Sequence, residues 1–358
     1  MKLHSLEIAN FRAIEKLSLD FTDYLGRPRP INLLVGPNGS GKTSILDAIH
    51  VMVKIFENPR QPNFREGLEY SVQQLVRGRG TLAEILFEFS LDQEEAAAIN
   101  AVYAALELNQ HFNLEREDQP PLNIPTKIRW IYPNIKPSGR SAYFYEYLDK
   151  NAVRVLGARG RASQAKSRGL FYDEIFEKIG GVCYLDQRRS IRLHKIFEYQ
   201  PNQELREHGD VLSWLNDYYR KHLSWNQEKY GESYWQRIQR LFNKICYPAE
   251  LIGLESGPGV ETLILRKNGT EYDLLQMSSG EHQILRILVS LTAEKAKNSI
   301  VLIDEVELHL HPTWQERLID VLREDSSNNQ YIFTTHSPAV MKLFYDSEII
   351  SLGALEVK

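Results

Sequence analysis

The chain has 358 residues, of which 42% are hydrophobic and 25% charged, as in ordinary globular proteins of one large or two smaller domains. Its 43 basic and 47 acidic residues give a net charge of −4, which excludes a general electrostatic attraction to nucleic acid. Cys183 and Cys246 are too few for a disulfide framework, and neither a signal peptide nor an apolar run of membrane-spanning length is present. These features predict a cytoplasmic protein without membrane association.

The first element with a chemical signature is a glycine-rich loop between a predicted strand, Ile31–Val35, and a predicted helix that includes 44–49. The loop completes the GxxxxGK[ST] pattern of phosphate-binding loops. Glycines allow a tight turn that directs backbone N–H groups at phosphate oxygens, and the helix N-terminus adds partial positive charge. The loop consists of Gly36, Pro37, Asn38, Gly39, Ser40, Gly41, Lys42 and Thr43, and Ser44 follows it.

This loop predicts that the chain binds a nucleoside triphosphate. Lys42 should reach the β- and γ-phosphates, and the Thr43 hydroxyl should bind Mg²⁺. The alternative is a glycine-rich turn without a ligand, but the flanking strand and helix favour the phosphate loop.

The middle of the chain contains several weaker predicted elements. A helix is expected over 92–107, and strands are expected over 128–132 and 142–147. Residues 151–170 are rich in glycine, serine and arginine and predict a flexible loop. Two amphipathic helices with many aromatic residues are expected within 210–247. No heptad repeat is sustained, so the middle predicts a compact helical arm or lid rather than a long coiled coil.

Basic residues gather in the predicted loop and again some twenty residues later. They could follow a nucleic-acid backbone, although charge runs are usually solvated surface and no aromatic residues are interleaved in the loop to stack bases. DNA binding and an ordinary surface loop therefore stay open as alternatives. The cluster comprises Arg154, Arg159, Arg161, Lys166, Arg168, Arg188, Arg189, Arg192 and Lys195.

A serine-rich segment, Leu275–Glu281, precedes a predicted helix over 282–297. Ser278 or Ser279 can cap this helix, and Glu281 lies in its first turn, where acidic side chains are favoured. By itself the segment indicates a helix cap.

The chain then has an apolar strand that ends in two adjacent acids, Asp304 and Glu305. Because successive side chains on a strand point in opposite directions, the two acids should have different roles. Asp304 is placed to hold Mg²⁺, and Glu305 can accept a proton from an attacking water. A further buried strand, 331–335, leads to His336 and should lie beside the acidic strand.

In this order, the motifs resemble the ABC-class ATPase heads of the SMC, RecF and OLD-like groups. Leu6–Ile14 looks like the N-terminal hairpin of that group, and Leu308–Pro312 looks like the segment after its acidic pair. The resemblance implies an α/β P-loop NTPase with a mixed central sheet, an N-terminal antiparallel β-subdomain and an inserted helical arm or lid. The expected division is 1–90 and 249–358 for the head and 91–248 for the insertion.

The resemblance implies that two heads enclose two ATP molecules with Mg²⁺. Lys42, Glu305 and His336 then correspond to catalytic residues, with His336 as the switch histidine, and Thr43 and Asp304 correspond to metal ligands. The signature segment of each subunit faces the γ-phosphate bound by the other. This segment consists of Ser278, Ser279, Gly280 and Glu281.

Some positions depart from the family pattern or stay unassigned. Met277 and Glu281 replace the leucine and glutamine of the transporter signature, which favours the OLD-like and SMC-like branch over transporters. No glutamine is assigned to the Q-loop. His309 and His311 suggest either a zinc site or, preferably, a loop at the dimer contact, because neither a cysteine nor a third histidine is near.

OLD-family nucleases continue into a Toprim nuclease domain, whereas this chain stops at Lys358 without a second acidic cluster. The expectation is therefore an ATPase without its own cutting activity. Such heads resemble the ATPase subunits of prokaryotic anti-phage defence modules, which implies a homodimer or higher homo-oligomer with a separate nuclease or toxin as effector. Two alternatives stay open: a RecF-like DNA-repair clamp, and a scaffold that uses ATP only as an assembly ligand.

Overall fold

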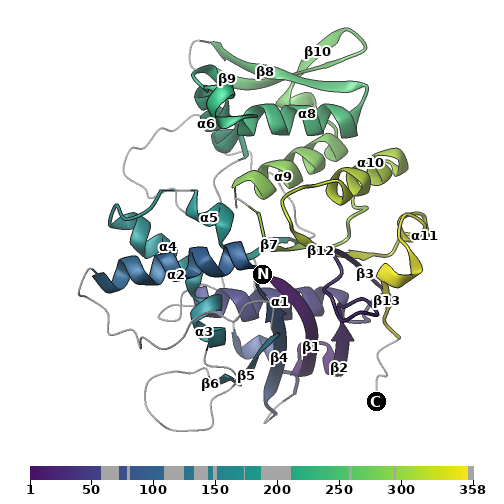
Figure 1. The fold of residues 1–358 in the computed structure, drawn as a ribbon. Coiled ribbons are helices and arrows are strands. Elements are labelled where there is room, and N and C mark those ends of the chain that lie inside the picture. The colour runs from purple at the N-terminus through teal and green to yellow at the C-terminus, as the bar shows by residue number, and fades with distance from the viewer. Residues whose placement is uncertain are drawn as a thin grey trace. The chain divides into compact units, whose positions relative to one another are not determined.

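The computed structural model describes residues 1–57, 72–78, 81–108, 125–132, 144–147, 151–172, 174–186, 211–257, 260–293 and 296–353 (Figure 1). The chain divides into two compact units. Unit 1 contains residues 1–186, 295–305 and 326–358, and unit 2 contains residues 187–294 and 306–325. This division differs from the expected boundaries at 90 and 248, because strands between 126 and 185 complete the two sheets of unit 1.

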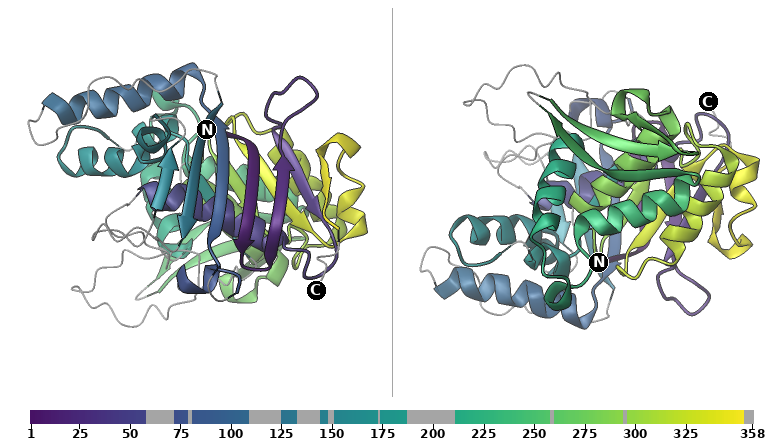
Figure 2. Two further views of the ribbon diagram at one scale, coloured as in Figure 1. Left: turned by 90° about the horizontal axis from the view of Figure 1, so that it is seen from below. Right: turned by 90° about the horizontal axis from the view of Figure 1, so that it is seen from above.

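The first sheet of unit 1 is antiparallel, with the strand order β2-β1-β4-β5-β6. β1 and β2 form a hairpin in which Phe11 pairs with Ile14, so the predicted N-terminal hairpin and antiparallel β-subdomain are confirmed. The left view of Figure 2 shows the purple and blue strands side by side. The strands are β1 (Lys2–Phe11), β2 (Ile14–Asp20), β4 (Ala83–Ser90), β5 (Thr126–Tyr132) and β6 (Phe144–Tyr147).

The second sheet of unit 1 has the order β13-β3-β12-β11-β7, and its pairings are parallel. Parallel strands covered on both faces are apolar along their length, and every residue of β3, β11 and β12 is buried. β12 pairs with the acidic strand β11, which confirms the prediction for the strand before His336, and on its other side it pairs with the phosphate-loop strand β3. The strands are β3 (Ile31–Val35), β7 (Val182–Leu185), β11 (Ile300–Ile303), β12 (Gln330–Thr335) and β13 (Ile349–Ser351).

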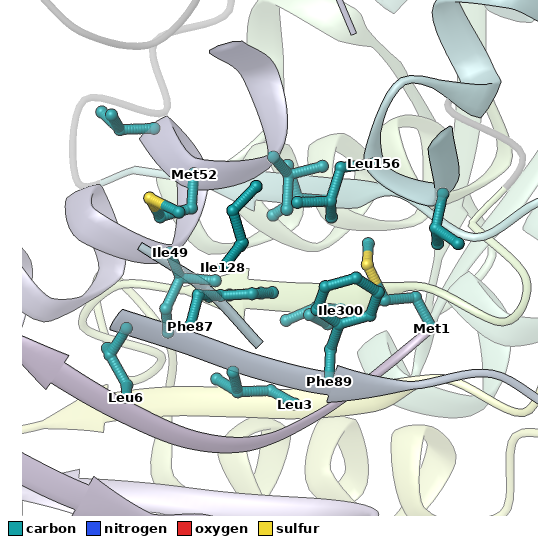
Figure 3. Close-up of a cluster of buried hydrophobic side chains, with 14 of the residues drawn as sticks. Met1, Leu3, Leu6, Ile49, Met52, Phe87, Phe89, Ile128, Leu156 and Ile300 are labelled. Carbon is teal, nitrogen blue, oxygen red and sulfur yellow. The ribbon is translucent and has the colours of Figure 1, made fainter. Parts of the chain in front are cut away.

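Helix α1 (Lys42–Glu57) packs against strands of both sheets and forms the centre of the core of unit 1. Ile49 and Met52, three residues apart on one helix face, are fully buried with Phe87 of β4 and Ile128 of β5 (Figure 3). Burying a large apolar side chain contributes about 1.5–3 kcal/mol. The helix that carries Lys42 and Thr43 is therefore fixed by its apolar face.

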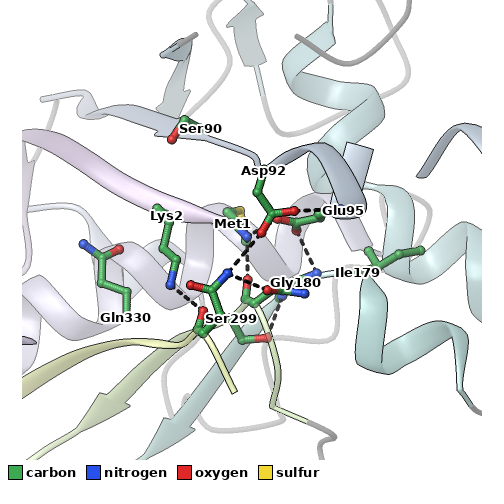
Figure 4. Close-up of polar contacts among 12 residues, drawn as sticks. Met1, Lys2, Ser90, Asp92, Glu95, Ile179, Gly180, Ser299 and Gln330 are labelled. Carbon is green, nitrogen blue, oxygen red and sulfur yellow. Dashed lines mark hydrogen bonds and ion pairs between the residues drawn. The ribbon is translucent and has the colours of Figure 1, made fainter. Parts of the chain in front are cut away.

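Buried polar side chains also join the segments of unit 1 (Figure 4). The fully buried Gln330 of β12 accepts a hydrogen bond from the Leu3 N–H (2.6 Å) and donates one to the Leu3 carbonyl (3.0 Å). The Gln330 side chain thus supplies hydrogen-bond partners to one backbone N–H and one backbone carbonyl of β1, as a neighbouring strand would do. Glu95 accepts a hydrogen bond from the Gly180 N–H (2.8 Å) and forms an ion pair with the amino group of Met1.

The prediction of a flexible loop over 151–170 is wrong for residues 151–167. These residues form α3 (Asn151–Leu156) and α4 (Ala158–Ser167). Ala158, Ala162 and Ala165 are fully buried, which places small side chains on one face of α4 at helical spacing. Alanine and arginine are good helix formers, and this tendency outweighs the glycine and serine content that suggested a loop. Two more helices, α2 (Gln93–Leu108) and α5 (Ile175–Lys178), pack against α4.

Unit 2 combines helices with a three-stranded antiparallel sheet of order β10-β9-β8. Helix α8 buries Trp235, Ile238, Phe242 and Ile245 on one face, and α6, α9, α10 and β8 pack against it. The two predicted amphipathic helices are thereby confirmed (Figure 2, right). The elements are α6 (Val211–Leu223), α7 (Gln227–Tyr230), α8 (Tyr234–Cys246), β8 (Ala249–Gly257), β9 (Val260–Lys267), β10 (Thr270–Asp273), η2 (Leu274–Gln276), α9 (Ser279–Ala293) and α10 (Pro312–Arg323).

Short elements complete the described fold: η1 (Val72–Leu75), α11 (Pro338–Met341) and η3 (Asp346–Glu348). Within the described ranges, none of the helices has both the length and the apolar character needed to cross a bilayer.

Candidate nucleotide-binding and hydrolysis site

The phosphate loop connects the end of β3 to the start of α1 at Lys42. Gly39 and Gly41 have φ angles of +79° and +90°, a backbone region that residues with side chains rarely adopt. The buried Lys42 ammonium donates hydrogen bonds to the carbonyls of Gly36 (2.9 Å) and Pro37 (3.0 Å). The loop thus has the tight curvature expected of a phosphate cradle, with a positive charge held against it.

Thr43, the second residue of α1, meets the first acid of the pair that follows β11. Its hydroxyl donates to Asp304 Oδ2 over 2.9 Å, and the Thr334 hydroxyl donates to Asp304 Oδ1 over 2.5 Å. Asp304 is 1% exposed, and its N–H donates to the Leu185 carbonyl at the end of β7. A hydroxyl and a carboxylate in contact are a donor set that fits Mg²⁺, which prefers oxygen ligands.

The second acid, Glu305, is oriented differently from Asp304. Its side chain is 27% exposed, and its Oε1 lies 3.9 Å from Nε2 of His336, which is 33% exposed. Its backbone has a φ of +46°, in the left-handed region, and its N–H donates to the Thr334 hydroxyl over 2.7 Å. The Glu305 carboxylate and the His336 ring are therefore both open to solvent, whereas the Asp304 carboxylate is buried.

The structure adds residues that the sequence motifs did not single out. Thr334 contacts both acids from the end of β12, and its only sequence signal is a polar residue within a buried strand. Arg12, at the β1–β2 turn, forms an ion pair with the buried Asp47 of α1, one turn after the phosphate loop. These contacts link the loop helix and the acidic pair to neighbouring strands.

The signature segment belongs to unit 2. The Glu281 carboxylate accepts hydrogen bonds from the N–H (2.7 Å) and hydroxyl (2.8 Å) of Ser278, and the Ser278 hydroxyl accepts one from the Glu281 N–H (3.3 Å). Tyr272 of β10 donates to the other Glu281 oxygen over 2.8 Å. The predicted helix cap is confirmed. Contact of Ser278, Ser279, Gly280 and Glu281 with a nucleotide stays a prediction.

Two neighbours of the signature segment are also located. A side chain at Gly280 would approach the His309 carbonyl to 2.8 Å and the Trp314 ring to 3.0 Å, so a larger residue does not fit there. His311 accepts a hydrogen bond from the Thr313 N–H (3.3 Å) and caps α10. Among the described residues, no group of three or more His, Cys, Asp or Glu side chains is arranged to hold a metal ion.

Part of the basic cluster is used in packing within unit 1. The Arg154 guanidinium lies 4.4 Å from the centre of the Tyr103 ring. Arg159 lies over the ring of Phe176 and donates to the carbonyl of Ile179 (2.9 Å). These two side chains hold helices together rather than forming an open basic track. The predicted positions Arg188, Arg189, Arg192 and Lys195 lie outside the described residues.

The phosphate loop, acidic pair and histidine lie at the ends of parallel strands in a unit that also has an antiparallel sheet. Together they define a P-loop ATPase of the ABC class, and this predicted class is confirmed. The chain belongs to the family described as "AAA domain, putative AbiEii toxin, Type IV TA system", whose model matches residues 31–342.

Individual proteins are also similar to this chain in sequence or in structure. The chain is 20% identical over 393 residues to "Retron Vc95 probable ATPase" of Vibrio cholerae serotype O1 biovar El Tor, covering 100% of this chain and 74% of that protein. It is 23% identical over 364 residues to "Septu protein PtuA" of Bacillus thuringiensis, covering 98% and 76%. A solved Smc head bound to the C-terminal winged-helix domain of ScpA has the same fold, with a TM-score of 0.55, 16% identity and coverage of 98% and 94%.

Proposed function

We propose that this ATPase dimerises around ATP and gates a separate effector, a nuclease or toxin, in an anti-phage defence module. The observation that carries the hydrolytic part is a set of hydrogen bonds around Asp304. The Thr43 and Thr334 hydroxyls each donate to one Asp304 carboxylate oxygen, and the Thr334 hydroxyl accepts the Glu305 N–H. The relatives whose names refer to a retron and to Septu support the biological setting. Because the site uses ATP, the proposal places the protein in the cytoplasm.

In this proposal each site residue of unit 1 has a separate role in ATP hydrolysis. The loop amides and Lys42 bind the phosphates, and Thr43 and Asp304 hold Mg²⁺. When bound, Mg²⁺ offsets charge on the β- and γ-phosphate oxygens. Glu305 accepts the proton of the attacking water, and His336 orients that water beside the γ-phosphate.

The proposed dimer adds groups from a second copy of the chain. The N-terminus of its α9, at Ser279 and Gly280, offers backbone N–H groups and partial positive charge to the γ-phosphate. ATP would then join two copies, and hydrolysis would separate them. An effector that binds only one of these two states would be held or released according to the nucleotide.

The hydrolytic part is tested with Glu305→Gln, which removes the base and keeps the shape of the side chain. Phosphate release should fall by about 10²–10⁴-fold. ATP should still bind, and light scattering should detect an ATP-dependent dimer. Glu316→Gln, on the exposed face of α10, is the matched control and should behave as the wild type. Wild-type turnover in Glu305→Gln would refute the assignment of the base.

The effector is tested by capturing tagged Glu305→Gln protein from its native host with ATP, followed by mass spectrometry. Lys42→Ala, which should not hold ATP, is the control bait. A stoichiometric nuclease or toxin on the first bait alone would support the proposal. Recovery of only DNA and recombination proteins would support a RecF-like clamp instead. A nucleotide-bound wild-type oligomer with negligible turnover would indicate an assembly scaffold.

A further inference from the structure

We propose that Thr334 is a positioning residue for both acids of the hydrolysis site. One hydrogen bond of its hydroxyl fixes the Asp304 carboxylate, and another fixes the backbone of Glu305. This inference rests on the proposed roles of these two acids and adds the group that sets their geometry.

The two hydrogen bonds of Thr334 have opposite directions and do not compete. A hydroxyl carries one hydrogen and two lone pairs. The Thr334 hydroxyl donates its hydrogen to Asp304 Oδ1 over 2.5 Å and accepts the Glu305 N–H over 2.7 Å. Thr334 is fully buried, so no surface water can replace either bond without a rearrangement of the strand ends.

The first bond orients the proposed metal ligand. Asp304 has two carboxylate oxygens, and Thr334 occupies Oδ1 while Oδ2 accepts the hydrogen bond from Thr43. A carboxylate held at both oxygens has little freedom to rotate, so Oδ2 stays directed at the Thr43 hydroxyl. Partners that orient a metal ligand typically affect metal affinity or activity by about 10–100-fold.

The second bond supports an unfavourable backbone conformation. Glu305 has a φ of +46°, and non-glycine residues seldom adopt this left-handed region. Ile303 pairs with Phe333, so Thr334 is the first β12 residue beyond the end of β11, where the acidic strand turns. Its hydroxyl is therefore placed to hold the Glu305 N–H at the turn and to keep the carboxylate near His336.

Substitutions at Thr334 distinguish the effect of its hydroxyl from the effect of its side-chain packing. Valine keeps the β-branched shape that suits a buried strand but removes both hydrogen bonds. Serine keeps the hydroxyl and loses one methyl group. Alanine removes the hydroxyl without placing a new methyl group beside a carboxylate. Thr126→Val, at a buried threonine of β5, is the matched control for this change elsewhere in unit 1.

The experiment measures ATP turnover against Mg²⁺ concentration for each variant, and ATP affinity in EDTA. Thr334→Val and Thr334→Ala should lower kcat by about 10–100-fold and require more Mg²⁺ for half-maximal rate. Their affinity for metal-free ATP should stay within about threefold of the wild type, because the phosphate loop is unchanged. Thr334→Ser should keep most of the turnover, and Thr126→Val should match the wild type.

Each other outcome counts against the inference. Wild-type turnover and Mg²⁺ dependence in Thr334→Val or Thr334→Ala would overturn it. Equal losses in the serine and valine variants, with a lowered melting temperature, would assign Thr334 a packing role only. Glu305→Gln is measured in parallel: if it is inactive while Thr334→Val is normal, only this inference fails. If both turn over normally, the proposed function fails as well.

Discussion

The hydrolysis site in unit 1 and the signature segment in unit 2 hold their polar groups in different ways. Thr43 and Asp304 are 261 positions apart in sequence, and their contact depends on the packing of α1 and the parallel sheet. Tyr272 and Glu281 are nine positions apart, and the helix cap of α9 is made by neighbouring residues. A site built from distant strands depends on its whole core, whereas a local cap depends on few bonds. Substitutions in unit 1 should therefore disturb the stability or activity of the whole site, whereas substitutions in unit 2 should act only near the substituted residue.

The largest expected effect is that of Lys42→Ala. The variant loses a buried ammonium at the phosphate loop, and charged hydrogen bonds contribute about 1.5–3 kcal/mol each. ATP affinity, measured by calorimetry, should fall by about 100-fold or more. Lys244→Ala, whose exposed ammonium pairs with Glu324 on the surface of unit 2, should leave it unchanged. Equal ATP affinity in wild type and Lys42→Ala would exclude this lysine from the phosphate site.

Gly180→Ala tests how far the core of unit 1 depends on close contacts between distant segments. A methyl group there would lie 2.0 Å from the Asn298 carbonyl and 2.5 Å from the Glu95 carboxylate. Such overpacking should lower the free energy of unfolding by about 1–3 kcal/mol, seen as a lower urea midpoint. Gly253→Ala in unit 2 is the control, because its methyl group would have its nearest neighbour, the Tyr219 oxygen, at 3.5 Å. Equal midpoints would contradict the comparison of the two units.

Tyr272→Phe should produce a smaller and more local effect. It removes one hydrogen bond to the buried Glu281 carboxylate, while the two bonds from Ser278 remain. The expected loss of stability is about 1 kcal/mol, with a reduction of turnover by a few-fold and unchanged ATP affinity. Tyr230→Phe, at an exposed tyrosine of unit 2, is the control. Lost ATP affinity in Tyr272→Phe would show that this bond reaches the nucleotide site.

The smallest expected effect is a pH dependence at His282 of α9. Burial lowers the pKa of its imidazole from 6.5, with partial offset by the charge of Glu281 and a hydrogen bond to the Leu274 backbone. The unfolded chain therefore binds a proton more readily than the folded one. The stability contribution of the neutral imidazole is complete above about pH 6.5 and is lost as the pH falls below this value. Urea unfolding of His282→Gln at pH 7.5 and 5.5 should show a weaker pH dependence than the wild type.

The sequence was sufficient where a motif and its flanking pattern agreed. The buried strands before Gly36, Asp304 and His336 were predicted, because continuous apolar runs that end in polar motifs are typical of parallel strands. The interpretation of 151–170 as a loop was wrong, because its glycine and serine content hid the alanine spacing of α4. In that segment Ala158, Ala162 and Ala165 form the buried face of helix α4.

The sequence by itself determined the class of protein, since the order of the phosphate loop, signature, acidic pair and histidine is independent of any contact between them. Only the tertiary structure brought Thr334 to Asp304 and Glu305, because a strand's neighbours are set by sheet order and not by distance along the chain. It also placed β5, β6 and β7 in the sheets of unit 1, where β5 and β6 extend the antiparallel sheet beyond β4 and β7 pairs with β11. Motifs identify the chemistry, and strand pairing decides which side chains carry it out together.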